Sequence, residues 1–250
     1  MVGIDVGGSV IKGARVNVNN GLLADRIEEL TAPARTPTVV ARQVASIVAR
    51  CGGEGPVGVT LPGVIRNGVV ERAANLSKWW AGCNAVELLE SAVERPVVVL
   101  NDADAAGIAE IQFGAGRNQN GQVLMLTFGT GIGSALFERG QLFSRTELGH
   151  ISIDGRPGEF HAALRAMHRE RLTWQQWAMR ANHYLAAVET VLYPDLIIIG
   201  GGVSLHADEW WNLVRTRTEC VLAGLRNDAG MVGAAMTAHA ALIRPIPGPR

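Results

Sequence analysis

Asn101 and Asp102 are the residues of this sequence best placed to do acid–base chemistry. They end the apolar run "VVVLND", and Asp104 follows within a segment of small residues. A carboxylate at the end of a strand can serve as a general base when it faces a cleft. The same place in the chain also suits a helix cap, so the position of Asp102 by itself leaves both interpretations open.

A second group of polar residues could hold a molecule that carries several hydroxyls. "TELGHISIDG" supplies Glu147 and His150, Glu159 follows, and "AANLSKWW" places Asn75 beside aromatic residues. Carboxylates, carboxamides and an imidazole suit such a ligand, because each hydroxyl can both donate and accept a hydrogen bond. A purely structural role is equally open for each of these side chains alone.

Two turns between apolar runs are rich in glycine. "GIDVGGSVIKGARV" contains Asp5, Gly7 and Gly8, and "LMLTFGTGIGSALF" contains Gly129 and Gly131. Glycine permits positive φ and lets backbone N–H groups approach an anion. These hairpin tips could therefore hold phosphates, with Asp5 holding a magnesium ion through water. Neither turn has the spacing of a Walker loop or a dinucleotide fingerprint. The alternative is a hairpin that needs glycine only for its turn.

A third glycine cluster, Gly200, Gly201 and Gly202, follows the apolar run that begins at Leu196. Ligands of α/β proteins bind beyond the carboxyl ends of strands, so this cluster could form a wall for a nucleotide or another phosphate chain. A plain strand-to-helix turn is the alternative, although a single glycine would usually suffice for that turn.

Most of these candidate residues lie at the ends of expected strands or in the turns between them. Apolar runs predict strands at "MVGIDV", "VIKGARVNV", "PVGVTL", "RPVVVLND", "QVLMLTF", "GSALFERG" and "DLIIIGGG". Helical character predicts helices over 37–50, 84–94, 103–113, about 159–192, 207–223 and 228–242. This alternation predicts an α/β architecture with largely parallel sheets. The similar hairpins that begin each half predict two related halves facing one another across a cleft.

The composition restricts the partners of the chain. It has 250 residues, 48% of them hydrophobic, and Lys+Arg and Asp+Glu total 23 each. A chain without net charge has no overall field that would recruit nucleic acid or an anionic membrane, and we expect neither partner. The three cysteines have no C-x-x-C spacing, which predicts a reduced cytoplasmic compartment and no structural zinc site.

Five motifs in order resemble the sugar kinases of the ROK (repressor/ORF/kinase) family in the actin-like ATPase superfamily. They are "DVGGSVIKG", "LNDADAAG", "LTFGTGIGSAL", "TELGHISIDG" and "IIIGGGVS". Within the family the chain is most similar to the polyphosphate glucokinases, over nearly its whole length. The resemblance implies a homodimer with an α/β, two-lobed actin-like ATPase (ribonuclease H-like) fold. The small lobe would comprise 1–101 with the returning segment 228–250, and the large lobe 102–227.

The resemblance also implies a role for each matching residue. Asp102 would be the general base that takes the proton from the 6-hydroxyl of glucose, with magnesium as the cofactor. The residues implied to hold the other sugar hydroxyls are Asn75, Asn101, Glu147, His150 and Glu159. The implied phosphate motifs are Asp5, Gly7, Gly8, Ser9 and Lys12 for the first, Gly129, Thr130 and Gly131 for the second, and Gly200, Gly201 and Gly202 for the third.

Polyphosphate and ATP are both compatible donors. "GRPGEFHAALRAMHRE" contains no cysteine, which suits the polyphosphate branch because that branch lacks the zinc motif of many ROK kinases. If residues 159–171 form one helix, His161, Arg165, His168 and Arg169 share a face. A polyanion could lie along that face, with arginines gripping its phosphate oxygens. A solvated helix face is the alternative.

The sequence departs from the family pattern at two places, and other functions stay as alternatives. Ser9 stands where the family usually has Thr, and "KWWAGCNA" differs from the residues that usually follow the sugar-site Asn. An ATP-dependent kinase for another hexose, either mannose or an N-acetylhexosamine, is one alternative. A non-catalytic sugar-sensing regulator is another, and an actin-like filament or chaperone ATPase is a third.

Overall fold

The structure is a computed structural model that describes residues 1–73 and 76–243, so Asn75 lies outside the described residues. The contacts of the chain divide it into two compact units. The first is Met1–Ala109 with the C-terminal segment from Asp228, and the second is Glu110–Asn227. The lobe boundaries expected from the sequence, after residues 101 and 227, stay a prediction.

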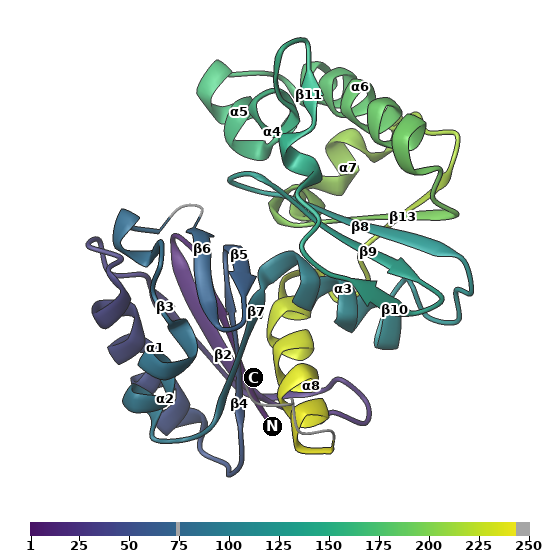
Figure 1. The fold of residues 1–250 in the computed structure, drawn as a ribbon. Helices are drawn as coiled ribbons and strands as arrows, with labels where there is room; N and C mark the ends of the chain where they lie inside the picture. The colour runs from purple at the N-terminus through teal and green to yellow at the C-terminus, as the bar shows by residue number, and fades with distance from the viewer. Residues whose placement is uncertain (74–75, 244–250) are drawn as a thin grey trace. The chain divides into compact units, whose positions relative to one another are not determined.

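The first unit contains a five-stranded sheet in the order β3-β2-β1-β4-β7 (Figure 1). Strands β1 (Val2–Val6), β2 (Val10–Val16) and β3 (Leu23–Leu30) are antiparallel neighbours, which confirms the predicted N-terminal hairpin. Strands β4 (Val57–Leu61) and β7 (Val97–Asn101) continue the sheet in parallel with β1. The register places Asp5 of β1 between Lys12 of β2 and Thr60 of β4.

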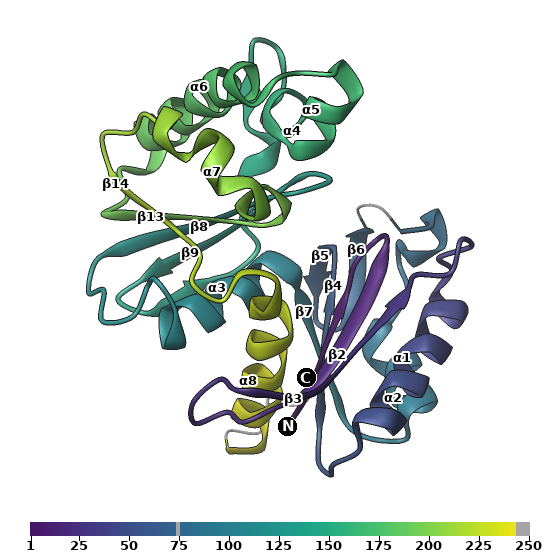
Figure 2. The same ribbon diagram turned by 180° about the vertical axis from the view of Figure 1, so that it is seen from behind.

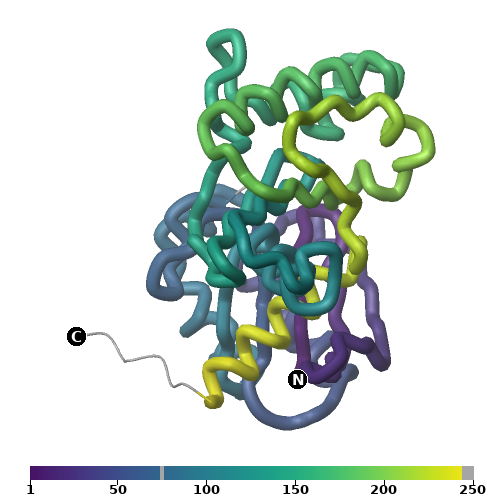
Figure 3. The backbone as a smooth tube through the Cα atoms, turned by 90° about the vertical axis from the view of Figure 1, so that its right-hand side faces the viewer, coloured from purple at the N-terminus to yellow at the C-terminus, as the bar shows by residue number. Residues whose placement is uncertain are grey.

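Helices cover both faces of this sheet (Figure 2). One face carries α1 (Pro37–Cys51), which begins with proline in its first turn, and α2 (Ala85–Val93), which is capped by the Asn84 side chain. The other face carries α8 (Ala229–Ile243), which lies against β1 and β4 (Figure 3). Gly3 and Gly58 permit this close packing, because a Cβ on either residue would overlap a backbone carbonyl of α8.

The short hairpin of β5 (Gly63–Arg66) and β6 (Val69–Ala73) follows β4, and the 3-10 turn η1 (Lys78–Trp80) precedes α2. Two elements span the boundary between the units. Helix α3 (Asp102–Phe113) begins directly after β7, and the 3-10 turn η5 (Arg226–Asp228) leads into α8.

The second unit repeats the sheet of the first. Its strand order is β10-β9-β8-β13-β14, from β8 (Gln122–Phe128), β9 (Ile132–Glu138), β10 (Gln141–Phe143), β13 (Leu196–Gly200) and β14 (Glu219–Leu222). Strands β8, β9 and β10 are antiparallel neighbours, and β13 and β14 run parallel to β8. Strand order and directions therefore match those of the first unit, which confirms that the two halves are related in topology.

Helix α6 (Trp174–Leu192) supplies the largest share of the apolar core of the second unit. A Thr173–Gln176 capping box starts it, and Trp177, Tyr184 and Leu185 pack with residues of β8 and β13. The other elements of this unit are η2 (Leu148–His150), β11 (Ser152–Ile153), β12 (Arg156–Pro157), α4 (Gly158–Ala162), α5 (Leu164–Glu170), η3 (Gly202–His206), α7 (Ala207–Trp210) and η4 (Trp211–Leu213).

Two of the predicted helices are wrong in part. The segment 159–192 forms three helices, α4, α5 and α6, rather than one. The segment 207–223 is helical only at its start, and residues 219–222 form the edge strand β14 beside β13. A short apolar run such as "CVLA" fits a strand or a helix equally well. Here it forms a strand because it pairs with the edge of β13. Across the described residues, every helix is too short or too polar to cross a bilayer.

Candidate phosphate and sugar sites

Asp5 sits at the end of β1 with a neighbour on each side. Thr60 Oγ1 donates a hydrogen bond to Asp5 Oδ1 over 2.7 Å, and Lys12 Nζ lies 3.9 Å from Oδ2. The Thr60 hydroxyl in turn accepts from the backbone nitrogen of Val6 over 3.3 Å. Gly230, in the first turn of α8, has no room for a Cβ because it would lie 2.9 Å from Asp5 Cγ. The carboxylate is therefore fixed by the sheet and by the start of α8.

The oxygen donors at Asp5 fit the expected magnesium. Mg²⁺ prefers oxygen ligands and often keeps several of its waters, so one fixed carboxylate can hold it through water. Within residues 1–73 and 76–243, no three His, Cys, Asp or Glu side chains form a metal-binding group. A site of this kind would therefore rely on the bound phosphates for its remaining ligands.

The first glycine turn is closed by its own backbone. Gly7 N donates to Val10 O over 2.9 Å, and a Cβ on Gly7 would lie 2.8 Å from that oxygen. Thr31 fastens the turn to the next strand, because its hydroxyl donates to Gly7 O over 2.7 Å and its backbone nitrogen to Ser9 O over 2.9 Å. Gly7 does not adopt positive φ. Close approach of the backbone, rather than a left-handed conformation, is the reason for glycine here.

Asn101 and Asp102 lie at the junction of β7 and α3, in the first unit. Asn101 Oδ1 accepts from the backbone nitrogens of Ala103 (2.8 Å) and Asp104 (3.1 Å), so Asn101 caps α3. Its amide nitrogen donates to Gly63 O over 3.0 Å. Asp102 is the first residue of the helix, and its Oδ1 accepts from Ala103 N over 2.9 Å. The cap is thus Asn101, which leaves Asp102 in the first helical turn, where the helix dipole stabilises a negative charge.

Glu147, His150 and Glu159 come together in the second unit. His150 Nε2 lies 3.5 Å from Glu147 Oε2, and His150 Nδ1 lies 3.7 Å from Glu159 Oε1. The three side chains are about a third exposed, at 41%, 29% and 34% in chain order. An imidazole between two carboxylates, partly open to solvent, can donate to and accept from neighbouring ligand hydroxyls.

Glu159 also touches the second glycine turn. Ile132 N donates to Glu159 Oε2 over 3.3 Å, and a Cβ on Gly131 would overlap the same oxygen. Gly129 N donates to Gly131 O over 2.9 Å and closes the turn, with Thr130 exposed at its tip. Neither Gly129 nor Gly131 adopts positive φ. Of the two reasons for glycine that the sequence offers, close approach applies to this turn as well, because a side chain on Gly131 would meet Glu159.

The third glycine cluster lies against the strand that leads into this turn. Gly201 adopts a positive φ of 79°, and a Cβ there would lie 2.6 Å from Phe128 O. Ser204 fastens the bend, because its hydroxyl donates to Gly201 O over 2.8 Å. The second and third glycine motifs are thus neighbours within one unit. Among their glycines, Gly201 alone adopts positive φ.

Ser134 holds the segment that carries Glu147 and His150 against β9. Its hydroxyl accepts from Leu148 N over 3.1 Å, and Thr146 Oγ1 donates to Ser134 O over 2.9 Å. A Cβ on Gly149 would overlap Ile132 O, so only glycine allows this segment to lie so close to the strand. Sequence reasoning missed Ser134, Thr60 and Thr31. For Ser134 and Thr60 the available signal was a lone hydroxyl in an apolar strand, because a buried hydroxyl requires a partner. Thr31 follows the polar strand β3 and offered no such signal.

The predicted continuous helix over 159–171 is wrong, because the helix breaks at Ala163, and only Arg165, His168 and Arg169 of the four basic residues share a helix, α5. Ala163 is extended, with φ −62° and ψ 153°. The Trp177 indole donates to Ala162 O over 2.7 Å, and Arg165 N donates to Gly129 O over 3.1 Å. A continuous helix would use both groups within itself, so contacts with α6 and the glycine turn favour two short helices over one.

Arg169 is instead organised around Phe160. Its guanidinium lies 4.0 Å from the ring centroid of Phe160 and donates to Phe160 O over 2.7 Å. Arg156 lies 5.3 Å from the same centroid. Glu170 binds Arg169 and Arg180 at 2.6 Å each, and hydrogen bonds from these two arginines lower the pKa of the Glu170 carboxyl. His168 and Arg165 are exposed on α5.

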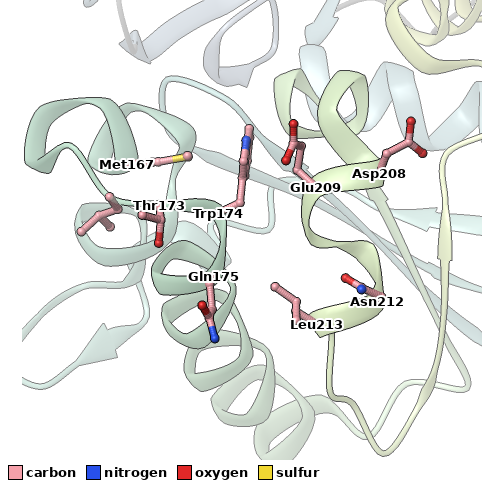
Figure 4. Close-up of a pocket in the computed structure, with 9 residues that line it drawn as sticks. Met167, Thr173, Trp174, Gln175, Asp208, Glu209, Asn212 and Leu213 are labelled. Atoms are coloured by element: carbon pink, nitrogen blue, oxygen red, sulfur yellow. The ribbon is translucent and has the colours of Figure 1, made fainter.

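A pocket of about 650 Å³ lies elsewhere in the second unit (Figure 4). Residues from the start of α6 line one side, and residues from α7 and η4 line the other. Its lining residues are Met167, Leu172, Thr173, Trp174, Gln175, Asp208, Glu209, Asn212 and Leu213. This set contains two carboxylates and no lysine or arginine, and it includes none of the predicted site residues. It therefore does not suit a phosphate chain.

The predicted site residues that the structure describes are thus divided between the two units. The first unit places Asp5 beside Lys12 and, at another strand end, Asn101 beside Asp102. The second unit gathers the Glu147, His150 and Glu159 cluster with the second and third glycine motifs. Asn101 ends its strand, whereas Glu159 belongs to helix α4.

A model of the ROK family matches residues 1–168 of the chain. A curated polyphosphate glucokinase from Mycobacterium tuberculosis (strain CDC 1551 / Oshkosh) is 47% identical over 240 residues, which cover 95% of this chain and 91% of that protein. The chain belongs to the ROK family. The polyphosphate glucokinase of Mycobacterium leprae (strain TN) is 45% identical over 95% of this chain and 74% of its own length.

Solved structures of ROK proteins share the fold. An inorganic polyphosphate/ATP-glucomannokinase from Arthrobacter sp. strain KM has a TM-score of 0.93 and 44% identity, and the match covers 96% of this chain and 98% of that one. A ROK family glucokinase from Streptomyces griseus, in complex with glucose and AMPPNP, has a TM-score of 0.84 at 24% identity, over 96% and 99% of the two chains. These likenesses confirm the predicted α/β fold of the actin-like ATPase type.

Proposed function

We propose that this protein transfers a phosphoryl group from inorganic polyphosphate or ATP to the 6-hydroxyl of glucose, giving glucose 6-phosphate. Its 47% identity to a polyphosphate glucokinase over 95% of the chain is the observation that carries the proposal. The local geometry supports it, because Asp5 precedes a glycine turn in the first unit and Glu159 contacts one in the second. The protein is accordingly a kinase of the glucokinase type.

Asp102 is the proposed general base. It begins α3, and its backbone is fixed by the Asn101 cap, so its carboxylate has a defined position at the strand end. The carboxylate orients the attacking hydroxyl and accepts its proton as the new bond to phosphorus forms and the bond from phosphorus to the donor's bridging oxygen breaks. Since phosphoryl transfer has a loose transition state, an ordinary carboxylate suffices and positioning supplies most of the acceleration.

Asn75, Asn101, Glu147, His150 and Glu159 are the proposed partners of the remaining sugar hydroxyls. The spacing of His150 between Glu147 and Glu159 supports this, because the three groups present donors and acceptors within one small surface. Asn101 would combine this role with its cap of α3. Asn75 enters the proposal from the sequence alone.

The donor phosphates are proposed to bind at the three glycine motifs. Gly7, Gly8, Ser9 and Lys12 would form the first, Gly129, Thr130 and Gly131 the second, and Gly200, Gly201 and Gly202 the third. Backbone N–H groups at such turns bind anions without a Cβ in the way. Asp5 would hold magnesium through water, and that ion neutralises charge on the phosphate oxygens when bound.

The distal part of a polyphosphate chain is proposed to bind at a basic group formed by Arg156, Arg165, His168 and Arg169. Arg165 supports this role because its backbone nitrogen donates to Gly129 O, which joins α5 to the second glycine turn. Guanidinium groups bind phosphate oxygens in pairs and suit a repeating polyanion. ATP is shorter and would depend less on this group.

Mannose is a second candidate sugar. The Arthrobacter enzyme that is 44% identical is a glucomannokinase, so its name includes a second hexose. The variant stretch "KWWAGCNA" after Asn75 also differs from the usual family pattern. We therefore include mannose as an acceptor to be tested beside glucose.

Initial rates test the proposal directly. Purified protein with magnesium receives glucose or mannose, and either polyphosphate or ATP, and the hexose 6-phosphate is measured. A polyphosphate-dependent rate supports the full proposal, and a rate with ATP alone supports the kinase but removes the role of the basic group. Absence of hexose 6-phosphate with every combination of sugar and donor refutes the proposal. A cytoplasmic location, which the cysteine pattern predicts, and a homodimer, which the family resemblance implies, complete the proposal. Light scattering after size exclusion tests the homodimer.

A further inference from the structure

Tyr184 lies behind the predicted sugar-binding cluster of the second unit. It belongs to α6, and its side chain is 0% exposed. The ring of Phe128 meets it edge-on at 5.9 Å, and a Cβ on Gly158 would lie only 2.6 Å from Tyr184 Cδ2. The ring is therefore held between the residue before the second glycine turn and the residue before Glu159.

The hydroxyl of Tyr184 has no hydrogen-bond partner among the residues that the structure describes. A buried hydroxyl without a partner is destabilising, and phenylalanine would keep the ring packing without that hydroxyl. The neighbouring aromatic residues do not share this property. Trp177 Nε1 donates to Ala162 O over 2.7 Å, and Trp210 Nε1 donates to Val203 O over 3.0 Å. Packing alone does not account for a tyrosine at this position.

Glu159 is a suitable partner for this hydroxyl. Burial, and secondly the negative charge of Glu159, raises the pKa of the Tyr184 hydroxyl, so the group stays a proton donor at neutral pH. Glu159 uses Oε2 to accept from Ile132 N, and Oε1 lies 3.7 Å from His150 Nδ1. An ionised carboxylate offers about four lone-pair sites, so a further donor can be accommodated.

We propose that Tyr184 is a positioning residue for Glu159. When a sugar occupies the site, the Tyr184 hydroxyl donates a hydrogen bond to the Glu159 carboxylate, directly or through one buried water, and holds it toward the sugar. The inference rests on the proposed function, because it takes Glu159 as a sugar ligand. On this view the hydroxyl lacks a partner in the sugar-free protein because its partner comes into place only when the substrate binds.

The Tyr184→Phe variant separates this role from a structural one. Thermal unfolding without sugar should show an unchanged or higher Tm, because the variant removes a buried hydroxyl that has no partner. The KM for glucose should rise about tenfold, which corresponds to about 1.4 kcal/mol, while the KM for the donor stays within about twofold. Tyr193→Phe is the matched control. Tyr193 is the other tyrosine of the chain, and it is 70% exposed.

A double-mutant cycle with Glu159→Gln identifies the partner. If the hydroxyl acts through the carboxylate, Tyr184→Phe should add little to the loss of glucose affinity already caused by Glu159→Gln. Additive losses would overturn the inference. So would an unchanged glucose KM in Tyr184→Phe, or a lower Tm of the sugar-free variant, since the latter would show that the hydroxyl already has a structural partner.

The rise in Tm on sugar binding distinguishes failure of the proposed kinase function from failure of the positioning role of Tyr184. Glucose and mannose should each be tested for this rise in the wild type and in Tyr184→Phe. If the wild type makes no hexose phosphate, the proposed function fails. A sugar-dependent Tm rise that shrinks in Tyr184→Phe would still support the positioning role, and an equal rise in both proteins would refute it.

Discussion

The backbone N–H of Ile132 and the carboxylate of Glu159 meet over 3.3 Å at the tip of the second hairpin. This contact joins a proposed sugar ligand to a turn that is proposed to bind phosphate. The contact depends on the glycine that precedes Ile132, because a Cβ on Gly131 would overlap Glu159 Oε2. The absence of a side chain at Gly131 therefore leaves room for the Glu159 carboxylate as well as for the proposed phosphate.

Gly131→Ala should weaken sugar binding. The added methyl must displace Glu159 or the turn, and the loss of one hydrogen bond to a charged group costs about 1.5–3 kcal/mol. The KM for glucose should therefore rise about tenfold or more. Steady-state kinetics at saturating donor measure it. In Gly129→Ala the methyl meets no atom within 4 Å, so the glucose KM of that variant should change much less. Equal effects of the two substitutions would contradict the steric argument.

Asp102→Asn should lose turnover far more than sugar binding. Asparagine keeps the shape and can still accept from Ala103 N, but it cannot take a proton from the attacking hydroxyl. General base catalysis contributes about 10²–10⁴-fold, so kcat should fall by at least about a hundredfold. Calorimetric titration with glucose should give an affinity close to that of the wild type. A variant that kept most of its kcat would remove Asp102 from the mechanism. Asp208→Asn, at an exposed position on α7, is the control.

Thr60→Val should impair both the position of Asp5 and the stability of the first unit. Valine has the same shape but cannot donate to Asp5 Oδ1 or accept from Val6 N. A buried N–H without a partner costs about 1–3 kcal/mol, which should appear as a lower free energy of unfolding. The magnesium concentration needed for half-maximal rate should rise, because the carboxylate loses its fixed orientation. Thr60→Ser keeps the hydroxyl and should restore the magnesium response, and failure of this rescue would argue against the role.

The sequence predicted strands such as β1 and β8 because apolar runs bounded by glycine are a local pattern. The candidate site follows from a local pattern too, since Asp5 ends one apolar run and a glycine turn follows the other, and its role stays a prediction. Of the two reasons for glycine that the sequence left open, positive φ and close approach, different turns use different ones. Gly7 and Gly131 serve close approach, and only Gly201 adopts positive φ. Sequence alone cannot separate these causes, because both exclude a Cβ.

The misassigned segments depend on contacts between residues far apart in the chain. The Trp177 indole donates a hydrogen bond to the carbonyl of Ala162, and the backbone nitrogen of Arg165 donates to the carbonyl of Gly129. A segment with continuous helical character therefore breaks into α4 and α5. Strand β14 forms because the edge of β13 is available to it. Helical periodicity describes a segment by itself, and it carries no information about these competing hydrogen bonds.

Arg165→Gln should discriminate between the two donors. If polyphosphate extends along the basic group defined by Arg156, Arg165, His168 and Arg169, removal of one positive charge should raise the KM for polyphosphate about fivefold. The KM for ATP should change by less than about twofold. Competing salt should weaken polyphosphate binding to the wild type more than to the variant, because fewer ionic contacts remain to be screened. Initial rates at two ionic strengths measure both effects.

Arg139→Gln provides the comparison for this last prediction. Arg139 belongs to the same unit, carries the same charge and is 82% exposed at the turn between β9 and β10. A substitution there lowers the net charge equally but leaves the basic group intact, so its polyphosphate KM should match the wild type. If both variants raised the KM equally, the effect would come from overall charge rather than from a polyphosphate track. If neither did, the basic group would be a solvated surface, and the distal donor phosphates would bind elsewhere.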